Sequence, residues 1–255
     1  MKAKIWKALK VITIVAAMSL LGGVTFTTVQ YLRTSPRFEV KKILVLGGKR
    51  VTETQVLTQA DVPDKANVFS VDLAAIRERV ETMQWVRYAI VQRVFPDTIT
   101  IKLVEREPVG LARIRDKVFQ FDTDAVFLEY DPSTGVNYPI LDGLKPNDRS
   151  GNLRRVDLYS RVLRELQTQS ELSEIHINES DEVAVVLSGE PLLINLGVGD
   201  FHARWIFYLE EREKIQQYPD AVEVDLRFKG QAILKPRPDA PDEEKVIWDA
   251  EKKSL

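Results

Sequence analysis

An uncharged apolar run near the N terminus constrains this chain more than any other feature. The run, VITIVAAMSLLGGVTFTTVQYL, holds 22 residues from Val11 to Leu32. As a helix it would span roughly 33 Å at about 1.5 Å per residue, which matches a hydrocarbon core of about 30 Å. We therefore expect a membrane-spanning helix over residues 11–32, after a short basic tail over residues 1–10.

A cleaved signal peptide is the alternative, because a basic start followed by an apolar run is common to both. No A-x-A cleavage site follows the run, and apolar residues continue through Val24, Phe26 and Val29, which favours a retained anchor. Basic residues flank both ends, so local charge hardly orients the helix. Because ten residues are too few to fold, we expect a cytoplasmic N terminus and extracytoplasmic domains.

Composition excludes several classes of protein. The chain of 255 residues is 44% hydrophobic and 29% charged, an ordinary globular balance. Beyond the first ten residues, 32 basic side chains face 38 acidic ones, which argues against a nucleic-acid binder. Cysteine is absent, so disulfides, thiolate metal sites and a cysteine nucleophile are excluded.

Residues 38–107 have the pattern of a small domain with the order strand, helix, helix, strand, strand. The first helix is expected in TETQVLTQA, which opens with Thr52 as a possible N-cap and has Gln55 at the capping-box spacing. The second helix is expected in SVDLAAIRERVETM, where apolar residues recur at helical spacing. The stretches WVRYAIVQRVF and TITIKLV alternate like paired strands around a Pro-Asp turn.

Three charged residues, Glu105, Arg106 and Glu107, end the last of these strands before Pro108. Carboxylates two residues apart lie on one face of a strand and could share a proton or a metal. A catalytic pair would also need burial or a third ligand, and Arg106 points to the opposite face. We favour a solvated strand end that crosses between domains, with proline stopping the ladder.

Residues 108–235 predict a second, β-rich domain with two helices, and residues 236–255 a flexible tail. The expected elements are a meander of VGLARI, DKVFQFD and AVFLEYD closed by YPILDG, the helix NLRRVDLYSRVLRELQTQ, three strands, a helix capped by Asp200, and a last strand or hairpin, AVEVDLRFKGQAILKP. The fold class is therefore α+β, with a single N-terminal transmembrane helix.

No motif in the sequence points to catalysis. Gly197-Val198-Gly199 precedes a helix, but His202 stands where a dinucleotide loop requires a third small residue. In a strand, His176 and Glu179 would lie on opposite faces, so we expect neither histidine to bind a metal. G-x-S-x-G, P-loop and H-E-x-x-H motifs are missing from the sequence. We expect no enzymatic activity, no cofactor and no metal.

The stretch RVFPDTITIKLVEREPV, residues 93–109, together with the β-α-α-β-β order, resembles a POTRA domain. Its place directly after a single anchor resembles the FtsQ/DivIB family of bacterial cell-division proteins. The motifs VLGGKRVT, YPILDG, LGVGD and VDLRF extend the resemblance to about Leu234. Two departures are Gln84, where relatives usually carry proline, and Gly110, where they carry alanine.

The resemblance implies a non-enzymatic bitopic scaffold of the divisome, in the bacterial inner membrane and enriched at the septum. Such a scaffold recruits partners through its POTRA domain and helps control septal cell-wall synthesis. The implied partners are coiled-coil bitopic proteins of the FtsB/FtsL type, bound by strand addition along the last strand. Because that strand precedes the tail, we expect it to be a free edge of the sheet.

Carried over by motif, Arg227 is a candidate ion-pair donor to a partner carboxylate and Phe228 a candidate aromatic anchor where relatives have tyrosine. A core position is the alternative for Phe228. The expected backbone rail is Gly230, Gln231, Ala232, Ile233 and Leu234. One residue fewer than in relatives around Lys229-Gly230, and Lys-Pro-Arg-Pro after Leu234, put the detailed contacts in question.

Two other hypotheses remain open. A POTRA-bearing component of envelope protein transport would normally carry a run of about ten-residue amphipathic strands that form a barrel, and this sequence has none. A ligand-binding or enzymatic domain in residues 111–235 is the other.

Overall fold

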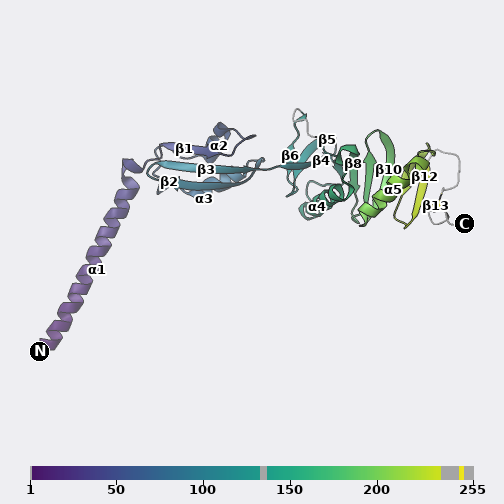
Figure 1. The fold of residues 1–255 in the computed structure, drawn as a ribbon. Helices are drawn as coiled ribbons and strands as arrows, with labels where there is room; N and C mark the ends of the chain where they lie inside the picture. The colour runs from purple at the N-terminus through teal and green to yellow at the C-terminus, as the bar shows by residue number, and fades with distance from the viewer. Residues whose placement is uncertain (1, 133–136, 237–246, 250–255) are drawn as a thin grey trace. The chain divides into compact units, whose positions relative to one another are not determined.

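The computed structural model describes residues 2–132, 137–236 and 247–249 (Figure 1). The chain divides into two compact units, Met1–Arg106 and Glu107–Leu255, and each is described by itself.

The first unit begins with the long helix α1 (Lys2–Thr34). Within the described residues, its segment Ile12–Thr34 is the one helix long and apolar enough to cross a membrane. Its large apolar side chains, such as Leu20 and Phe26, are exposed. A surface of this kind suits lipid, because apolar side chains are as stable in hydrocarbon as in a protein core. A short 3₁₀ turn, Pro36–Phe38, follows the helix.

The remainder of this unit has the expected β-α-α-β-β order. Its elements are β1 (Lys42–Leu46), α2 (Glu53–Ala60), α3 (Leu73–Glu81), β2 (Val86–Val94) and β3 (Thr98–Glu105). The strands form one sheet in the order β1-β3-β2. β3 pairs parallel with β1 and antiparallel with β2. The connection from β1 to β2 contains both helices, and β3 lies between these two strands in the sheet.

Local side-chain chemistry fixes where the two helices begin. Thr52 caps α2 and forms the predicted capping box with Gln55. The carboxylate of Asp72 accepts hydrogen bonds from the first amides of α3, which otherwise have no partner within the helix. Both helices contribute buried residues to one core with the strands, among them Val56, Ile76, Ile99 and Ile101.

The second unit contains a single sheet of ten strands. In chain order they are β4 (Pro108–Ile114), β5 (Lys117–Asp122), β6 (Phe127–Glu129), β7 (Ile140–Asp142), β8 (Leu172–Ile177), β9 (Val183–Leu187), β10 (Glu190–Gly197), β11 (Ala221–Asp225), β12 (Gln231–Pro236) and β13 (Ile247–Asp249). Across the sheet the order is β13-β12-β11-β10-β9-β8-β7-β4-β5-β6.

The expected meander over the first four strands is correct for β4, β5 and β6 and wrong for β7. The strand β7 does not continue next to β6; it lies on the other side of β4 and pairs in parallel with both β4 and β8. This crossover joins the meander to the rest of the sheet, so the unit has one continuous hydrogen-bonded layer.

Two helices, α4 (Arg149–Leu166) and α5 (Phe201–Ile215), bury their apolar residues in the same core as the strands. The largest fully buried side chains of this core are aromatic: Trp205, Tyr159, Tyr208, Phe121 and Phe201. The prediction that Asp200 caps α5 is correct in position but wrong about the side-chain hydrogen bond. Asp200 occupies the N-cap position with φ +51° and makes no side-chain capping hydrogen bond. A 3₁₀ turn, Gln169–Glu171, leads into β8.

Candidate functional site

The expected partner-binding residues lie in the turn between β11 and β12 and along β12. In the turn, Arg227 is already paired within its own unit. Its guanidinium donates to both carboxylate oxygens of Asp225, at 3.0 and 2.7 Å, and to Glu182 at 2.9 Å. The structure therefore gives Arg227 two intramolecular carboxylate partners, where the sequence suggested a partner from another chain.

These contacts shift the pKa values of all three groups. Burial raises the pKa of Asp225, but the hydrogen bonds and charge of Arg227 outweigh it and hold the pKa below its usual range. The hydrogen bond from Asn178, and then that from Arg227, lowers the pKa of Glu182. The hydrogen bonds from Arg227 to Asp225 and Glu182 raise its own pKa. All three side chains are thus held in their charged forms.

Gly197, at the end of β10, provides the space in which Arg227 lies. Its backbone has φ +63°, and an added Cβ would lie only 2.7 Å from Cγ of Arg227. Gly199 has a similar φ of +69° but has nothing within 4 Å of the added Cβ. The two glycines of the L-G-x-G-D motif therefore do different things: both permit a left-handed backbone, and only the first accommodates a neighbouring side chain.

Phe228 projects from the same turn and is 51% exposed. The core position considered as the alternative for this residue is therefore excluded. The amide of Gln231 donates to the Phe228 carbonyl at 3.2 Å, and Gly230 supplies the positive φ of +69° that closes the turn. An exposed aromatic side chain consequently stands beside the first residue of β12.

The strand β12 presents its two faces differently. Ala232 and Leu234 are buried in the core of the unit, whereas Gln231, Ile233 and Lys235 are half-buried on the other face. The ammonium group of Lys235 pairs with Glu223 of β11 at 2.7 Å. Pairing with β11 extends from Asp225–Ile233 to Ala221–Pro236, which secures one side of β12.

We expected β12 to be a free edge of the sheet, followed by a flexible tail. This expectation is wrong for the first three residues of β12. The short strand β13, within the tail, pairs antiparallel with Gln231, Ala232 and Ile233. The pattern that could have revealed it is Val-Ile-Trp at residues 246–248, because β-branched and aromatic residues favour strands. The rest of the tail, residues 237–246 and 250–255, lies outside the described residues.

In the charged cluster at the end of β3, the first residue, Glu105, has a structural role. One oxygen of Glu105 accepts hydrogen bonds from three successive backbone amides, those of Lys49, Arg50 and Val51, at 3.0, 2.9 and 2.8 Å. The predicted architectural role is supported, but Glu105 is engaged by backbone donors rather than solvated. Glu107 is exposed, and the two carboxylates form no shared site.

The histidines have partners that the sequence spacing did not indicate. His176 lies between Asp142 and Glu174, with Nδ1 and Nε2 at 3.2 and 3.1 Å from their carboxylates. Glu179 pairs instead with Lys145, and His202 contacts the Glu165 carbonyl. Across the described parts of the chain, no group of three or more His, Cys, Asp or Glu side chains is placed to hold a metal ion.

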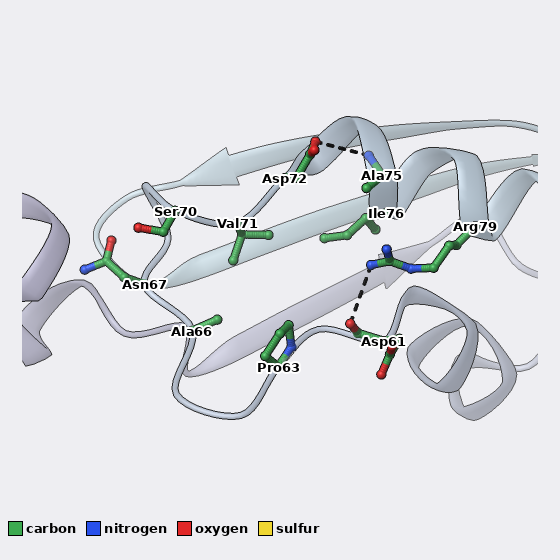
Figure 2. A pocket seen from close by; sticks show the side chains of 10 residues that line it. All are labelled: Asp61, Pro63, Ala66, Asn67, Ser70, Val71, Asp72, Ala75, Ile76 and Arg79. Atoms are coloured by element: carbon green, nitrogen blue, oxygen red, sulfur yellow. Dashed lines mark hydrogen bonds between the residues drawn. The ribbon is translucent and has the colours of Figure 1, made fainter.

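A hollow of about 460 Å³ lies between the end of α2 and the start of α3 (Figure 2). Its polar groups serve the fold. Asp72 caps α3, and the Arg79 guanidinium donates to the carbonyls of Ala60 and Asp61, the shortest bond being 2.6 Å. Asn67 accepts from the Phe69 amide. The groups around this hollow therefore do not form a catalytic constellation.

The first unit also carries an exposed apolar sheet face. The register places Leu46, Lys102 and Ile90 in one row across β1, β3 and β2. The large apolar side chains exposed on the two outer strands are Leu44, Leu46, Tyr88, Ile90 and Val94. Thr100 and Lys102 of β3 lie between these outer strands. Exposed apolar side chains with polar neighbours can mark a protein-interaction site, so this face, here called the open sheet face, is a second candidate surface.

These features define a class of protein: an N-terminal helix of membrane-spanning length, a POTRA domain and a second β-rich unit. Residues 38–106 match the family model described as POTRA domain, FtsQ-type. The POTRA domain of this chain is therefore of the FtsQ type.

Similarity to curated relatives extends beyond the POTRA domain. The chain is 29% identical to the cell division protein FtsQ of Koribacter versatilis, over 88% of this chain and 68% of that protein. It is 23% identical to the FtsQ protein of Syntrophotalea carbinolica, over 78% and 73% of the two chains. For FtsQ of Geotalea daltonii the identity is 21%, over 90% and 87%.

Proposed function

We propose that this protein is a non-enzymatic bitopic scaffold of the bacterial divisome. A role in cell division is supported by its relatives, which are named as cell division proteins. In this proposal α1 anchors the chain in the cytoplasmic membrane, with the N terminus in the cytoplasm and both units outside. The scaffold recruits and links other division proteins at the septum and so helps control septal cell-wall synthesis.

The observation that carries the proposal is the C-terminal margin of the ten-stranded sheet. There an exposed aromatic side chain, Phe228, stands at the start of β12, and a covering strand pairs with only three residues of β12. Backbone donors and acceptors along a sheet margin can be completed by an added strand, and a nearby aromatic anchor adds affinity. The rail would be residues 230–234, and the partners bitopic coiled-coil proteins of the FtsB/FtsL type.

Arg227 has a different part in this proposal from the one its motif suggested. Because Asp225 and Glu182 hold its guanidinium, it fixes the turn that carries Phe228. It would contact a partner carboxylate only by exchanging Glu182, the more exposed of its two partners.

The open sheet face is the proposed recruitment surface of the POTRA domain. Leu46 and Ile90 flank Lys102 on this face, so it fits an apolar segment that carries a carboxylate. This mode uses side chains, whereas the C-terminal margin uses backbone groups, and the two surfaces can therefore be tested separately.

The proposal is tested by co-purification of the full chain with tagged FtsB/FtsL-type proteins of the same organism, and by localisation of a fluorescent fusion. Phe228→Ala should reduce partner capture at least tenfold with an unchanged melting temperature. The matched control is Tyr218→Ala, which truncates another exposed aromatic of the same unit. Diffuse envelope fluorescence, or equal capture by the Phe228→Ala protein, would contradict the proposal. Diffuse fluorescence would instead favour envelope transport.

A further inference from the structure

The two neighbours of β12 cover different parts of it. On one side, β11 pairs with β12 from Ile233 to Pro236. On the other side, β13 pairs only with Gln231, Ala232 and Ile233. Among the described residues, Leu234 and Lys235 therefore have no strand opposite them on the β13 side.

The length, the edge position and the flanking sequence of β13 indicate that this strand is weakly held. It has three residues, against about 5–6 for an average strand, and it forms the last strand of the sheet. The ten residues before it, RPDAPDEEKV, include two prolines and four acidic side chains. Such a sequence has little tendency to extend the ladder. A marginal strand of this kind opens locally far more often than the strands at the centre of a sheet.

The pairing nevertheless shows what this margin accepts. It takes an extended segment that runs antiparallel to β12 and contains a β-branched and an aromatic residue, Ile247 and Trp248. A segment from another polypeptide, if it were longer than β13, would pair with the same three residues and continue opposite Leu234 and Lys235. It would form more backbone hydrogen bonds than β13 does, and each added bond favours exchange.

We propose that β13 is an internal occupant of the partner-binding margin, and that a partner strand binds antiparallel to β12 by displacing it. The inference rests on the proposed function and adds β13 as a competitor of the partner strand for β12. The tail then lowers the affinity of the margin for weak strands and protects a sheet edge that would otherwise be open to non-specific pairing. Only a segment that extends beyond Ile233 overcomes this competition.

Occupancy is tested first with a defined probe, a fluorescein-labelled peptide of residues 245–250, Lys-Val-Ile-Trp-Asp-Ala. It is titrated by anisotropy into the full chain in detergent, into the chain ending at Pro236, and into the full-length Trp248→Pro protein. We expect the truncated chain to bind the peptide at least tenfold more tightly than the full chain, with Trp248→Pro in between. The point variant keeps the tail, so it separates loss of pairing from loss of the whole segment.

Hydrogen exchange in the same three proteins shows whether the margin, rather than the fold, has changed. Amides of Gln231, Ala232 and Ile233 should exchange faster in both variants, and those of β9, near the middle of the sheet, should keep their rates. Unchanged exchange at Gln231–Ile233, or equal peptide binding by all three proteins, would overturn the inference.

Competition with a true partner is tested in cells with a photo-cross-linking amino acid at Lys235. The cross-linked product is identified by mass spectrometry, and its yield is compared with and without residues 237–255. A several-fold higher yield from the truncated chain supports displacement. An equal yield overturns the competition and leaves the proposed function intact. No cross-linked division protein in either chain would overturn the proposed function itself, and cross-links to a second copy would replace displacement by strand exchange between copies.

Discussion

Glu105 lies at the end of β3, yet its carboxylate is bound by the backbone of the loop after β1, through a 2.8 Å hydrogen bond from the Val51 amide. Lys49 and Arg50 donate to the same oxygen. Three convergent amides form a small anion-binding concavity. One of the two carboxylates considered as a catalytic pair therefore joins two strand ends of the POTRA domain.

Glu105→Ala should destabilise the POTRA domain, because three amides lose a charged acceptor. We expect the free energy of unfolding to fall by about 1.5–3 kcal/mol, as for a hydrogen bond to a charged group. Chemical denaturation measures the loss, and hydrogen exchange at residues 49–51 should accelerate. Glu107→Ala removes the neighbouring exposed carboxylate and is the matched control. Equal effects of the two substitutions would refute the special role of Glu105.

The pairing of Arg227 with Asp225 and Glu182 predicts a pH dependence of the second unit. Both carboxyl pKa values are lowered in the folded state. Their contribution is therefore present above the unfolded pKa values of about 4 and is lost as the pH falls through the folded values. Arg227→Gln leaves the carboxylate of Asp225 buried without its cation, so the variant is penalised most at neutral pH.

The measurement is the difference in melting temperature between the parent protein and Arg227→Gln, followed from pH 7 to pH 3. We expect a large difference at pH 7 that shrinks below about pH 4. Arg154→Gln breaks a more exposed ion pair with Asp181 and should cost little at any pH. A difference for Arg227→Gln that stays constant across this range would contradict the prediction.

Gly197→Ala and Gly199→Ala should differ although both glycines have positive φ. Each substitution strains the backbone by about 1 kcal/mol, but only the first also forces Arg227 to move. We therefore expect Gly197→Ala to be more destabilising by at least about 1 kcal/mol, as measured by urea denaturation. Combining Gly197→Ala with Arg227→Ala should recover part of this excess. Equal losses for the two single variants would show that the contact with Arg227 is unimportant.

The open sheet face can be tested without disturbing the POTRA core. Ile90→Asp places a carboxylate beside Lys102 and removes an exposed apolar side chain, so stability should change by less than about 0.5 kcal/mol. Under the proposed function, the mid-cell fraction of a fluorescent fusion should fall by at least half. Leu153→Asp makes the same exchange at an exposed position of α4 and should leave localisation unchanged. Normal localisation of Ile90→Asp would remove this face from the proposal.

Much of the fold could be predicted because its determinants are local. The capping box of Thr52 and Gln55, the spacing of apolar residues in α3 and the alternation along β2 and β3 all depend on residues close in sequence. The crossover of β7 could not be predicted in this way, since its pairing with β4 and β8 depends on partners about 30 residues away in either direction.

Gly110 shows the same limit at a single position. The sequence marks it only as a departure from alanine. In the structure, an added Cβ would lie 2.3 Å from the ring of Phe121 and 2.9 Å from the hydroxyl of Tyr159. Both aromatic residues are fully buried, so glycine at residue 110 is matched to side chains that come together only in the folded unit.

The candidate site was located by motif, but its state could not be read from the motif. Arg227 and Phe228 were expected in a last strand or hairpin, and they lie in the turn between its two strands, β11 and β12. Whether Arg227 is already paired depends on residues such as Glu182, which is 45 positions away. The pairing of β13 with β12 likewise depends on a three-residue segment whose propensity is outweighed by the charged and proline-rich residues around it.

The order of strands also fixes the distance between the strand where the chain enters the second unit and the strand β12. The chain enters this sheet at β4, and β12 follows six strand steps further along it, roughly 29 Å at about 4.8 Å per step. A polypeptide that docks on β12 would therefore be set back from the entry strand by a distance fixed by the hydrogen-bond ladder. Inserting or deleting a hairpin between them would change that reach in increments of two strands without altering the docking strand itself.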